Sequence, residues 1–550
     1  MEKAKMRKKC KEAIDNIIKE GITDVEIFAD FLEINYLKEE KFRNRVVDEV
    51  VKRIENAVEN PLKSLNGLKL RKSGSVLVPK KNLSDFRRCA LIDVFDEIIY
   101  LTLVLYLAEK IEKSKIKKSE NVVYSYRYNP EQGYLFDREY NYTAFRNAVS
   151  RASRKDENKI MIECDISNFY DRLNLHRLES NLLSIYGIDK KIVAIINQVL
   201  LYWANRDSYG LPVGSNASRI LAEAALIEVD KYLVSKGVNF IRFVDDYRIF
   251  ATDAVTAFKH LTLLIERLNL EGLFLNTSKT KIQDISDKLE YAIEDDTVSN
   301  IQCVEDDHNR NENIEEINNA INKAKIIRGY SGVIPFKFRK LTENQIKSLS
   351  RVDIGTMLEK LSTKVIVKPE EITEMVRSIV AQRKWGEFDK TLPILSKFPQ
   401  FIPYFSDMTI KHLEQIPDKT LKSITQQFTK WFTEEDTPEY ILIYLVRFFA
   451  STESNNKEVM INYFRGLRRN SGDYIGRALL ESFGNKLSRN EILEVRKYYE
   501  RADVLEKRQI IMMIIKNMHK EERTPFFKDI KFINNDIFID YLINDINNKV

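Results

Sequence analysis

Hydrophobic and polar positions follow a helical spacing at both ends of the chain. The first 60 or so residues contain KEAIDNIIKEGI and FRNRVVDEVVKRIENAV, in which apolar residues recur at helical intervals. The last 230 or so residues contain amphipathic stretches such as DYIGRALLESF, NEILEVRKYYE and VLEKRQIIMMIIKNM, without strand-like alternation. These patterns predict an N-terminal helical cap over residues 1–60 and an all-α domain over residues 326–550. Helices separated by short breaks indicate stacked hairpins similar to an α-solenoid.

Strand-like runs occur in the middle of the chain. VLVPKK, directly after Ser75, reads as a short strand interrupted by Pro79, and an apolar helix follows from Ile92. Three further β-type runs come next, KIMIECDIS, NFIRFVDDYRIFA and, from Leu273, LFLNTSKTKI, with long helical patterns between them. This mixture predicts an α+β domain over residues 61–290.

Composition agrees with a folded, helix-rich protein of several domains. The 550 residues have room for three or four domains of about 150 residues. Gly and Pro, at 17 and 12 residues, are too few for a turn-dense all-β fold. Acidic and amide residues replace large apolar ones after Asp284, which indicates a linker over residues 291–325. Four scattered cysteines and five histidines suggest neither a disulfide framework nor a structural zinc site.

Charge and hydropathy limit the kinds of partner that the protein can have. No apolar stretch is long enough to cross a membrane, and the N-terminus MEKAKMRKKCKEAID lacks the apolar core of a secretory signal, so we expect a cytoplasmic protein without a membrane partner. The net charge of +6 permits a nucleic-acid partner without demanding one. Between Lys63 and Arg88, eight basic residues stand against the single acid Asp85. This cluster is either a solvated face or a docking site for an anionic ligand.

Three aspartates form the most informative constellation. Asp245 and Asp246 stand between the apolar runs FIRFV and YRIFA, which predicts a hairpin turn. A surface turn is the alternative interpretation of such a pair. Asp165, however, ends another buried β-type run, where a carboxylate projects toward a cleft. Asp165 and Asp245, each at the end of one of two neighbouring strands, could together hold two Mg²⁺ ions roughly 4 Å apart, as in phosphoryl transfer, with Mn²⁺ as a possible substitute.

The motifs around these acids resemble those of reverse transcriptases. CDISNFY is similar to polymerase motif A, YGLPVGSNAS to motif B, FVDD to motif C and GLFLNTSKTKI to motif D, and they occur in that order. VLVPKK followed by FRR resembles the fingers segment. The resemblance covers about residues 65–290. It implies a right-hand polymerase palm and fingers in an α+β fold, followed here by an all-α, HEAT-like helical repeat domain.

The resemblance assigns roles to individual residues. Asp165, Asp245 and Asp246 would be catalytic, and the metal ligands would come from Asp165, Ile166, Asp245 and Asp246. Tyr170, in preference to Phe169, would stack beneath the nucleotide sugar and reject a 2′-hydroxyl. The glycines of motif B would let the backbone approach the base pair. Basic residues would neutralise the triphosphate and the leaving pyrophosphate. The implied dNTP-binding residues are Lys80, Lys81, Arg87, Arg88, Phe169, Tyr170, Gly210, Pro212, Gly214 and Lys279, with Lys281 as a secondary candidate.

Two features differ from the usual reverse transcriptase motifs and narrow the resemblance to one group of these enzymes. Val213 stands where many reverse transcriptases have Gln, which puts template fidelity in doubt, and the SRILAE segment containing Arg219 is similar to prokaryotic abortive-infection and defence-associated reverse transcriptases. The resemblance therefore implies DNA synthesis from dNTPs in bacterial antiviral defence. The template is either a noncoding RNA or absent, with a protein hydroxyl as primer, and the priming residue is unknown. The alternative is a catalytically inactive nucleic-acid-binding scaffold. We also expect the helical domain to replace a thumb and to mediate homo-oligomer formation.

Overall fold

The computed structural model divides into two compact units. It describes residues 2–23, 31–80, 86–205, 207–286, 336–452, 456–467, 474–484, 486–531 and 536–547. The first unit contains Met1–Lys72 and Ile92–Gly329, and the second contains Ser73–Leu91 and Tyr330–Val550. The predicted linker over residues 291–325 lies outside the described residues.

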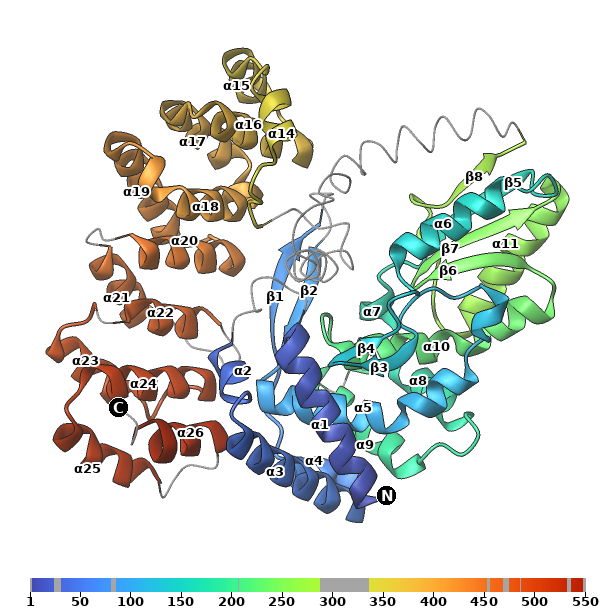
Figure 1. The fold of residues 1–550 in the computed structure, drawn as a ribbon, viewed down its shortest axis with the longest axis horizontal. Helices are drawn as coiled ribbons and strands as arrows, with labels where there is room; N and C mark the ends of the chain where they lie inside the picture. Colours follow the sequence, from blue (N-terminus) through green and yellow to red (C-terminus); the bar gives the residue numbers. More distant parts are fainter. Residues whose placement is uncertain are drawn as a thin grey trace. The chain divides into compact units, whose positions relative to one another are not determined.

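The first unit combines helices with short antiparallel strands (Figure 1). Its helices are α1 (Lys3–Glu20), α2 (Leu32–Tyr36), α3 (Glu40–Glu59), α4 (Ser64–Leu68), α5 (Val94–Ser114), α6 (Tyr142–Ser153), α7 (Phe169–Arg172), α8 (Leu175–Leu183), α9 (Lys190–Trp203), α10 (Asn216–Ser235) and α11 (Ala254–Leu270). Its strands are β3 (Tyr128–Glu131), β4 (Tyr134–Phe136), β5 (Ile160–Asp165), β6 (Asn239–Phe243), β7 (Asp246–Ala251) and β8 (Lys281–Asp284). The helices predicted at the N-terminus and from Ile92 are confirmed by α1, α3 and α5.

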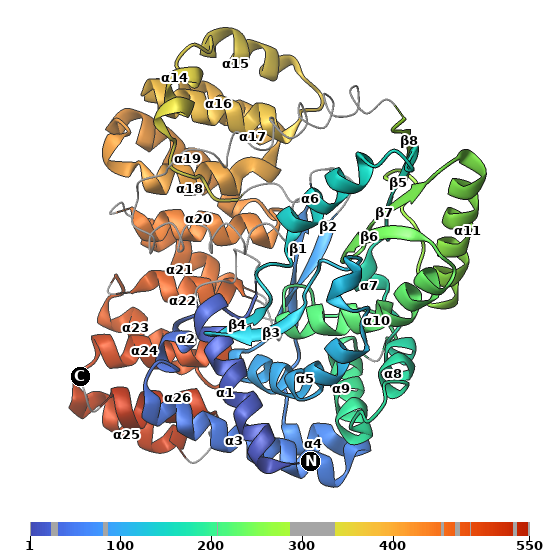
Figure 2. The ribbon, with the colours of Figure 1, turned by 45° about the vertical axis from the view of Figure 1, so that its right-hand side comes forward.

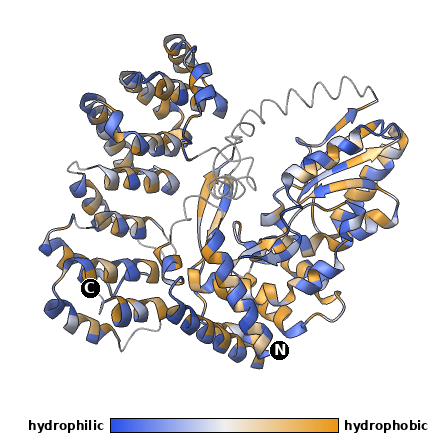
Figure 3. Ribbon diagram, in the orientation of Figure 1, coloured by the Kyte–Doolittle hydropathy of each residue, from blue (hydrophilic) through white to orange (hydrophobic). Residues whose placement is uncertain are grey.

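The largest described sheet of this unit has four antiparallel strands, in the order β6-β7-β5-β8. The sheet lies between α6 and α11 (Figures 1 and 2). On the α6 side, Phe145 packs into one buried cluster with Met161 and Phe250 from the strands. Figure 3 colours much of β5 and β7 as hydrophobic, which agrees with the packing of α6 and α11 against these strands. β5 and β7 pair along their whole length, so the predicted strands around Cys164 and from residues 239 to 251 are confirmed.

The strand expected from Leu273 begins later than the sequence pattern suggests. Strand pairing with β5 starts only at Lys281, and Leu275 makes a single bridge to Ile166. Asn276 explains the difference, because its backbone and side-chain oxygens accept hydrogen bonds from residues just after it and fold the chain into a turn. The prediction of a continuous strand from Leu273 is therefore wrong.

Among its described residues, the second unit is helical apart from one hairpin, in which β1 (Gly74–Pro79) pairs with β2 (Phe86–Leu91). β1 is the strand predicted from VLVPKK, and its antiparallel partner β2 had no prediction. The helices of this unit are α14 (Glu343–Leu349), α15 (Ile354–Thr363), α16 (Pro369–Gln382), α17 (Phe388–Lys397), α18 (Ile402–Lys411), α19 (Asp418–Thr433), α20 (Glu439–Ser451), α21 (Lys457–Gly466), α22 (Ile475–Phe483), α23 (Arg489–Tyr498), α24 (Val504–Asn517), α25 (Lys520–Lys531) and α26 (Ile537–Tyr541). The prediction of an all-helical C-terminal region is confirmed.

These C-terminal helices stack in sequence order. Along one row, α18 packs on α20, α20 on α22, α22 on α24 and α24 on α26, while the intervening helices pack on their chain neighbours (Figure 1). Such nearest-neighbour stacking is typical of helical hairpins built into a solenoid. None of the helices in the described ranges is long and apolar enough to span a bilayer.

Candidate active site

The three predicted aspartates meet at one end of the four-stranded sheet. β5 and β7 run antiparallel, and their register places Asp165 directly opposite Asp246. Asp245 lies in the short connection between β6 and β7, and its carbonyl oxygen accepts a hydrogen bond of 3.1 Å from the Ile166 amide. The strand next to Asp165 is thus β7, which Asp246 begins, whereas Asp245 occupies the predicted hairpin turn. Sequence reasoning had expected Asp165 and Asp245 each to end one of two neighbouring strands.

Burial and mutual repulsion dominate the electrostatics of these acids. Burial, together with the charge of Asp165, raises the pKa of Asp245 to about 7. Burial raises the pKa of Asp246 to about 6, although the adjacent Arg248 opposes this shift by pairing with the Asp246 carboxylate. Lys279 Nζ lies 3.0 Å from Asp165 Oδ2, and its side chain is 63% exposed. The three carboxylates therefore carry negative charge that Arg248 and Lys279 compensate only in part.

The oxygen atoms at this sheet end fit a divalent cation such as Mg²⁺. In the part of the chain that the structure describes, no three His, Cys, Asp or Glu side chains form a ready ligand cluster. Asp165 and Asp245 nevertheless offer hard carboxylate oxygens, and the buried Ile166 has only its backbone oxygen to offer. Burial and the charge of Asp165 disfavour the ionised form of Asp245, and a bound cation would offset both effects, so the donor set fits the expected ions.

The segment after Asp165 is joined to the loop that precedes α10. The Leu211 amide donates to the Tyr170 carbonyl at 2.9 Å, and the Gly210 amide donates to the Leu173 carbonyl at 3.0 Å. Phe169 is buried, whereas Tyr170 is partly exposed, which favours Tyr170 as the residue that meets a substrate. The structure thus brings the expected motif A aromatic residue next to the motif B loop.

Two glycines shape that loop. Gly210 and Gly214 have φ values of +98° and +114°, which other residues adopt only with strain. Pro212 lies between them and is partly exposed. After the second glycine, the Ser215 side chain caps α10 by accepting from the Ala217 amide. The resemblance to motif B assigns these glycines to a backbone that approaches the base pair, and that contact stays a prediction.

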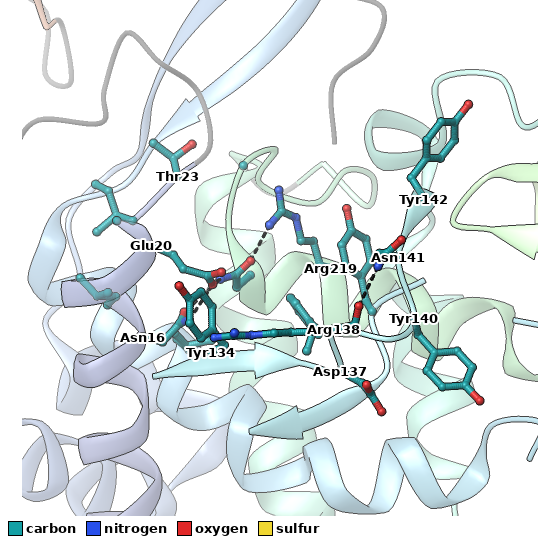
Figure 4. A pocket seen from close by; sticks show the side chains of 18 of the residues that line it. Asn16, Glu20, Thr23, Tyr134, Asp137, Arg138, Tyr140, Asn141, Tyr142 and Arg219 are labelled. Atoms are coloured by element: carbon teal, nitrogen blue, oxygen red, sulfur yellow. Dashed lines mark hydrogen bonds between the residues drawn. The ribbon is translucent and has the colours of Figure 1, made fainter. Parts of the chain in front are cut away.

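Sequence reasoning missed a cavity of about 180 Å³ beside this loop. Figure 4 shows Arg138 and Arg219 lying in it between Glu20 and Asn141. Arg138 lies 4.1 Å from the ring centroid of Tyr134, and Arg219 5.2 Å from that of Tyr126. Aromatic lining residues are Tyr126, Tyr134, Phe136, Tyr140, Tyr142 and Phe243, and polar ones include Asn16, Glu20, Glu97, Arg138, Asn216 and Arg219. The cavity joins α1, α5, the β4 segment and α10, so no local pattern could have predicted it.

One residue that lines this cavity, Glu97, stands out in the sequence because it is an acid within the apolar run of α5. It is almost fully buried, and Oε1 accepts from the Ser215 hydroxyl at 2.6 Å. Its other oxygen, Oε2, has no hydrogen-bond partner among the described residues. Burial raises the pKa of Glu97 to about 8, and the Ser215 hydrogen bond opposes this shift.

Replacing Glu97 by Gln is expected to make stability less dependent on pH. The folded pKa of about 8 exceeds the ordinary 4.5, so the stabilisation by the bound proton is full below pH 4.5 and is lost as the pH rises toward 8. The loss amounts to at most about 1.4 kcal/mol per pH unit. Thermal melts between about pH 6 and pH 9 should therefore show a smaller fall in melting temperature for Glu97→Gln than for wild type. Glu266→Gln, an exposed change on α11, should follow wild type, and equal slopes for Glu97→Gln and wild type would contradict the assignment.

The remaining predicted residues lie on β8 and on the hairpin. Lys281 begins β8 opposite Glu163 and is exposed. Lys80 directly follows β1, and Arg87 and Arg88 lie on β2, so these three belong to the second unit. Lys81 lies outside the described residues. Their contact with a triphosphate stays a prediction.

A family model matches the part of the chain that contains the four-stranded sheet. A family model described as reverse transcriptase (RNA-dependent DNA polymerase) matches residues 78–294. No curated protein matches the chain. Among solved structures, telomerase from Candida albicans with the TWJ fragment of telomeric RNA is 14% identical, with 68% of this chain and 66% of that chain covered and a TM-score of 0.28. Apo telomerase from Candida tropicalis is 12% identical over 80% of this chain and 86% of that chain, with a TM-score of 0.27.

Coverage limits how far these likenesses extend. The chain spans slightly less than two thirds of the Candida albicans chain, and 64% of a second Candida tropicalis telomerase, which also holds the TWJ fragment. That second structure is 12% identical over 68% of this chain, with a TM-score of 0.29. The family match, in contrast, spans β5, β6, β7 and β8 together with α10. Residues 78–294 thus match a reverse transcriptase domain, and the sheet that carries Asp165, Asp245 and Asp246 lies within this matched range.

Proposed function

We propose that the chain is a DNA-synthesising nucleotidyltransferase that adds dNTPs to a hydroxyl group by two-metal phosphoryl transfer. The observation that carries this proposal is the meeting of Asp165, Asp245 and Asp246 at one sheet end of the reverse transcriptase domain. A catalytically inactive scaffold is less well supported, because a binding surface gains nothing from three neighbouring carboxylates that repel one another.

Each acid has a distinct part in this chemistry. Asp165 and Asp245, with the backbone oxygen of Ile166, would hold the cations, and Asp246 would support them while paired with Arg248. Two Mg²⁺ ions, or Mn²⁺ in their place, would lower the pKa of the attacking hydroxyl and stabilise charge on the leaving pyrophosphate.

The resemblance assigns further residues to the dNTP. Tyr170 would lie beneath the sugar, and the Gly210–Gly214 loop would let the backbone approach the base. Lys80, Lys81, Arg87 and Arg88 would neutralise the triphosphate. The aromatic cavity with Arg138 and Arg219 suits stacking and charge pairing with a nucleotide of the bound strand.

Lys279 would assist the leaving group. Its ammonium group pairs with Asp165 and is well exposed, so it is available to donate a proton or a positive charge to pyrophosphate. Lys279→Ala is expected to lower kcat for nucleotide addition by about 100-fold, with a smaller effect on the KM for dNTP. Steady-state incorporation of labelled dNTP measures both constants. Lys259→Ala, an exposed lysine change on α11, is the matched control. A kcat within twofold of wild type for Lys279→Ala would remove Lys279 from the mechanism.

Two modes of synthesis remain open. In the first, a bound noncoding RNA is the template; in the second there is no template, and a protein hydroxyl is the primer. Purified protein is incubated with Mg²⁺ and each labelled dNTP, with and without prior ribonuclease treatment, and the product is then digested with protease. Synthesis that ribonuclease abolishes indicates an RNA template. Label that persists after ribonuclease and migrates with protein until protease releases it indicates protein-primed, untemplated synthesis. Absence of product under all conditions would favour the scaffold.

We further propose a role in bacterial antiviral defence, with self-association through the helical domain. The support is the SRILAE segment at the start of α10 and the stacked, all-helical region from α14 to α26, which we propose to be HEAT-like. Cells that express the wild-type chain should resist phage, and cells that express an inactive active-site variant should not. A strictly monomeric mass in solution would contradict the oligomeric part.

A further inference from the structure

The connection that carries Asp245 is held in an unfavourable backbone conformation. Val244, the residue just before Asp245, has a φ of +55°. In this left-handed region the Cβ atom crowds the following carbonyl, and a β-branched side chain makes the conformation worse. Such a conformation persists only when the surroundings enforce it.

Both polar backbone atoms of Val244 are fixed by buried side chains. Its amide donates to Ser125 Oγ at 2.9 Å, and its carbonyl oxygen accepts from Arg242 Nη1 at 2.8 Å. The Ser125 hydroxyl in turn donates to Glu223 Oε1 at 2.6 Å. Ser125 and Arg242 are both 0% exposed, so water does not compete for these bonds.

Arg242 uses all of its N–H groups in this arrangement. Nε and Nη2 donate to the Asp230 carboxylate at 2.9 and 2.6 Å, and Nη1 and Nη2 donate to the Glu223 carboxylate at 3.0 and 3.2 Å. The remaining N–H of Nη1 is the one that reaches Val244. An arginine has five such donors, and none is left over. Four of them clamp the guanidinium onto two carboxylates, and the fifth is directed at the strained peptide.

The clamp is anchored in the helix that follows the glycine loop. Glu223 and Asp230 lie seven positions apart on one face of α10. Lys115 Nζ lies 3.0 Å from Glu223 Oε2, so two buried positive charges balance two buried negative charges. Because α10 begins at Asn216, immediately after the loop, one rigid element supports both the loop and the connection that carries Asp245.

We propose that Arg242 and Ser125 are positioning residues, which hold Val244 in its left-handed conformation and thereby fix Asp245 next to Asp165. The inference rests on the proposed function, since it assigns these residues to the cation-binding carboxylates. The Val244 peptide leads directly into Asp245, whose own carbonyl is bonded to the Ile166 amide. Without the clamp the connection relaxes, and the Asp245 carboxylate loses its fixed place.

Ser125→Ala tests this role with a small change. The variant removes one hydroxyl and leaves the charges balanced. We expect kcat for nucleotide addition to fall by about 10- to 100-fold, as for a misplaced catalytic group. We also expect the dissociation constant for Mn²⁺, measured by electron paramagnetic resonance without nucleotide, to rise by about 10-fold or more. Ser153→Ala, an equally buried serine of α6 far along the chain from the connection, should leave both values unchanged.

Val244→Gly separates positioning from general stability. Glycine adopts positive φ without strain, so in a Val244→Gly background the clamp has less to enforce. The factor by which Ser125→Ala lowers kcat and Mn²⁺ affinity should therefore be at least about fivefold smaller in that background, as a double-mutant cycle measures. Should Ser125→Ala not fold, Arg242→Lys replaces it, because lysine keeps the charge but not the fork of donors.

The outcomes distinguish the clamp from the proposed function. A folded Ser125→Ala variant with wild-type kcat and Mn²⁺ affinity overturns the inference, and so does an impaired variant whose defect is the same with Val244→Gly. If the wild-type protein transfers no nucleotide, the proposed function fails, while the Mn²⁺ measurements alone still decide whether the clamp fixes Asp245.

Discussion

Replacing Asp245 by Asn is expected to lower the rate of nucleotide incorporation by about 10³-fold or more. The change keeps the size of the side chain but removes the negative charge that a divalent cation requires. Burial and Asp165 raise the pKa of Asp245 in the structure, so loss of this charge should not lower the melting temperature. Incorporation of labelled dNTP and thermal unfolding, measured on the same preparation, test both statements.

Asp165→Asn should have the same effect, since both acids would hold the proposed cations. Asp284→Asn is the matched control. This aspartate ends β8 opposite Ile160, at the other end of β5 from Asp165, and it is exposed. An Asp245→Asn protein that keeps a tenth or more of the wild-type rate would place the chemistry elsewhere in the chain.

Tyr170→Ala is expected to relax the choice between deoxyribonucleotides and ribonucleotides by about 100-fold, measured as the ratio of their kcat/KM values. The Tyr170 side chain is partly exposed, and its backbone carbonyl accepts a hydrogen bond from the Leu211 amide of the Gly210 loop. Phe169 is buried and pairs edge-on with the Tyr170 ring at 5.6 Å between centroids. Removal of the Tyr170 ring opens space where a 2′-hydroxyl would lie.

The control for this variant is Tyr186→Ala. Tyr186 is 95% exposed in the same unit, so its loss should change neither the fold nor the nucleotide preference. If Tyr170→Ala keeps the wild-type ratio of kcat/KM values while it remains active, Tyr170 does not contact the sugar, and the sugar site must be sought elsewhere in the loop.

Elements encoded by local patterns could be predicted from the sequence. Alternating or continuous apolar runs predicted β5, β6 and β7. Asp165 and Asp246 could be recognised as candidates because each interrupts or ends such a run. The same holds for α5, whose apolar positions are buried along nearly its whole length. The helical C-terminal region followed from its amphipathic period alone.

Features built from distant segments could not be predicted in this way. Ser125 lies 98 positions from Glu223 and 119 positions from Val244, and only folding brings these residues together. The pairing of Lys279 with Asp165 depends on the turn at Asn276, which ended the expected strand from Leu273. Each feature depends on side-chain hydrogen bonds between elements, which periodicity does not encode.

The most direct measurement is incorporation of labelled dNTP by the purified wild-type chain, in Mg²⁺ and in excess chelator. We predict labelled DNA in Mg²⁺, none with the chelator, and none with Asp245→Asn in either condition. Product that forms equally in chelator, or no product in Mg²⁺ or Mn²⁺ from a folded protein, would contradict a two-metal nucleotidyltransferase at Asp165 and Asp245.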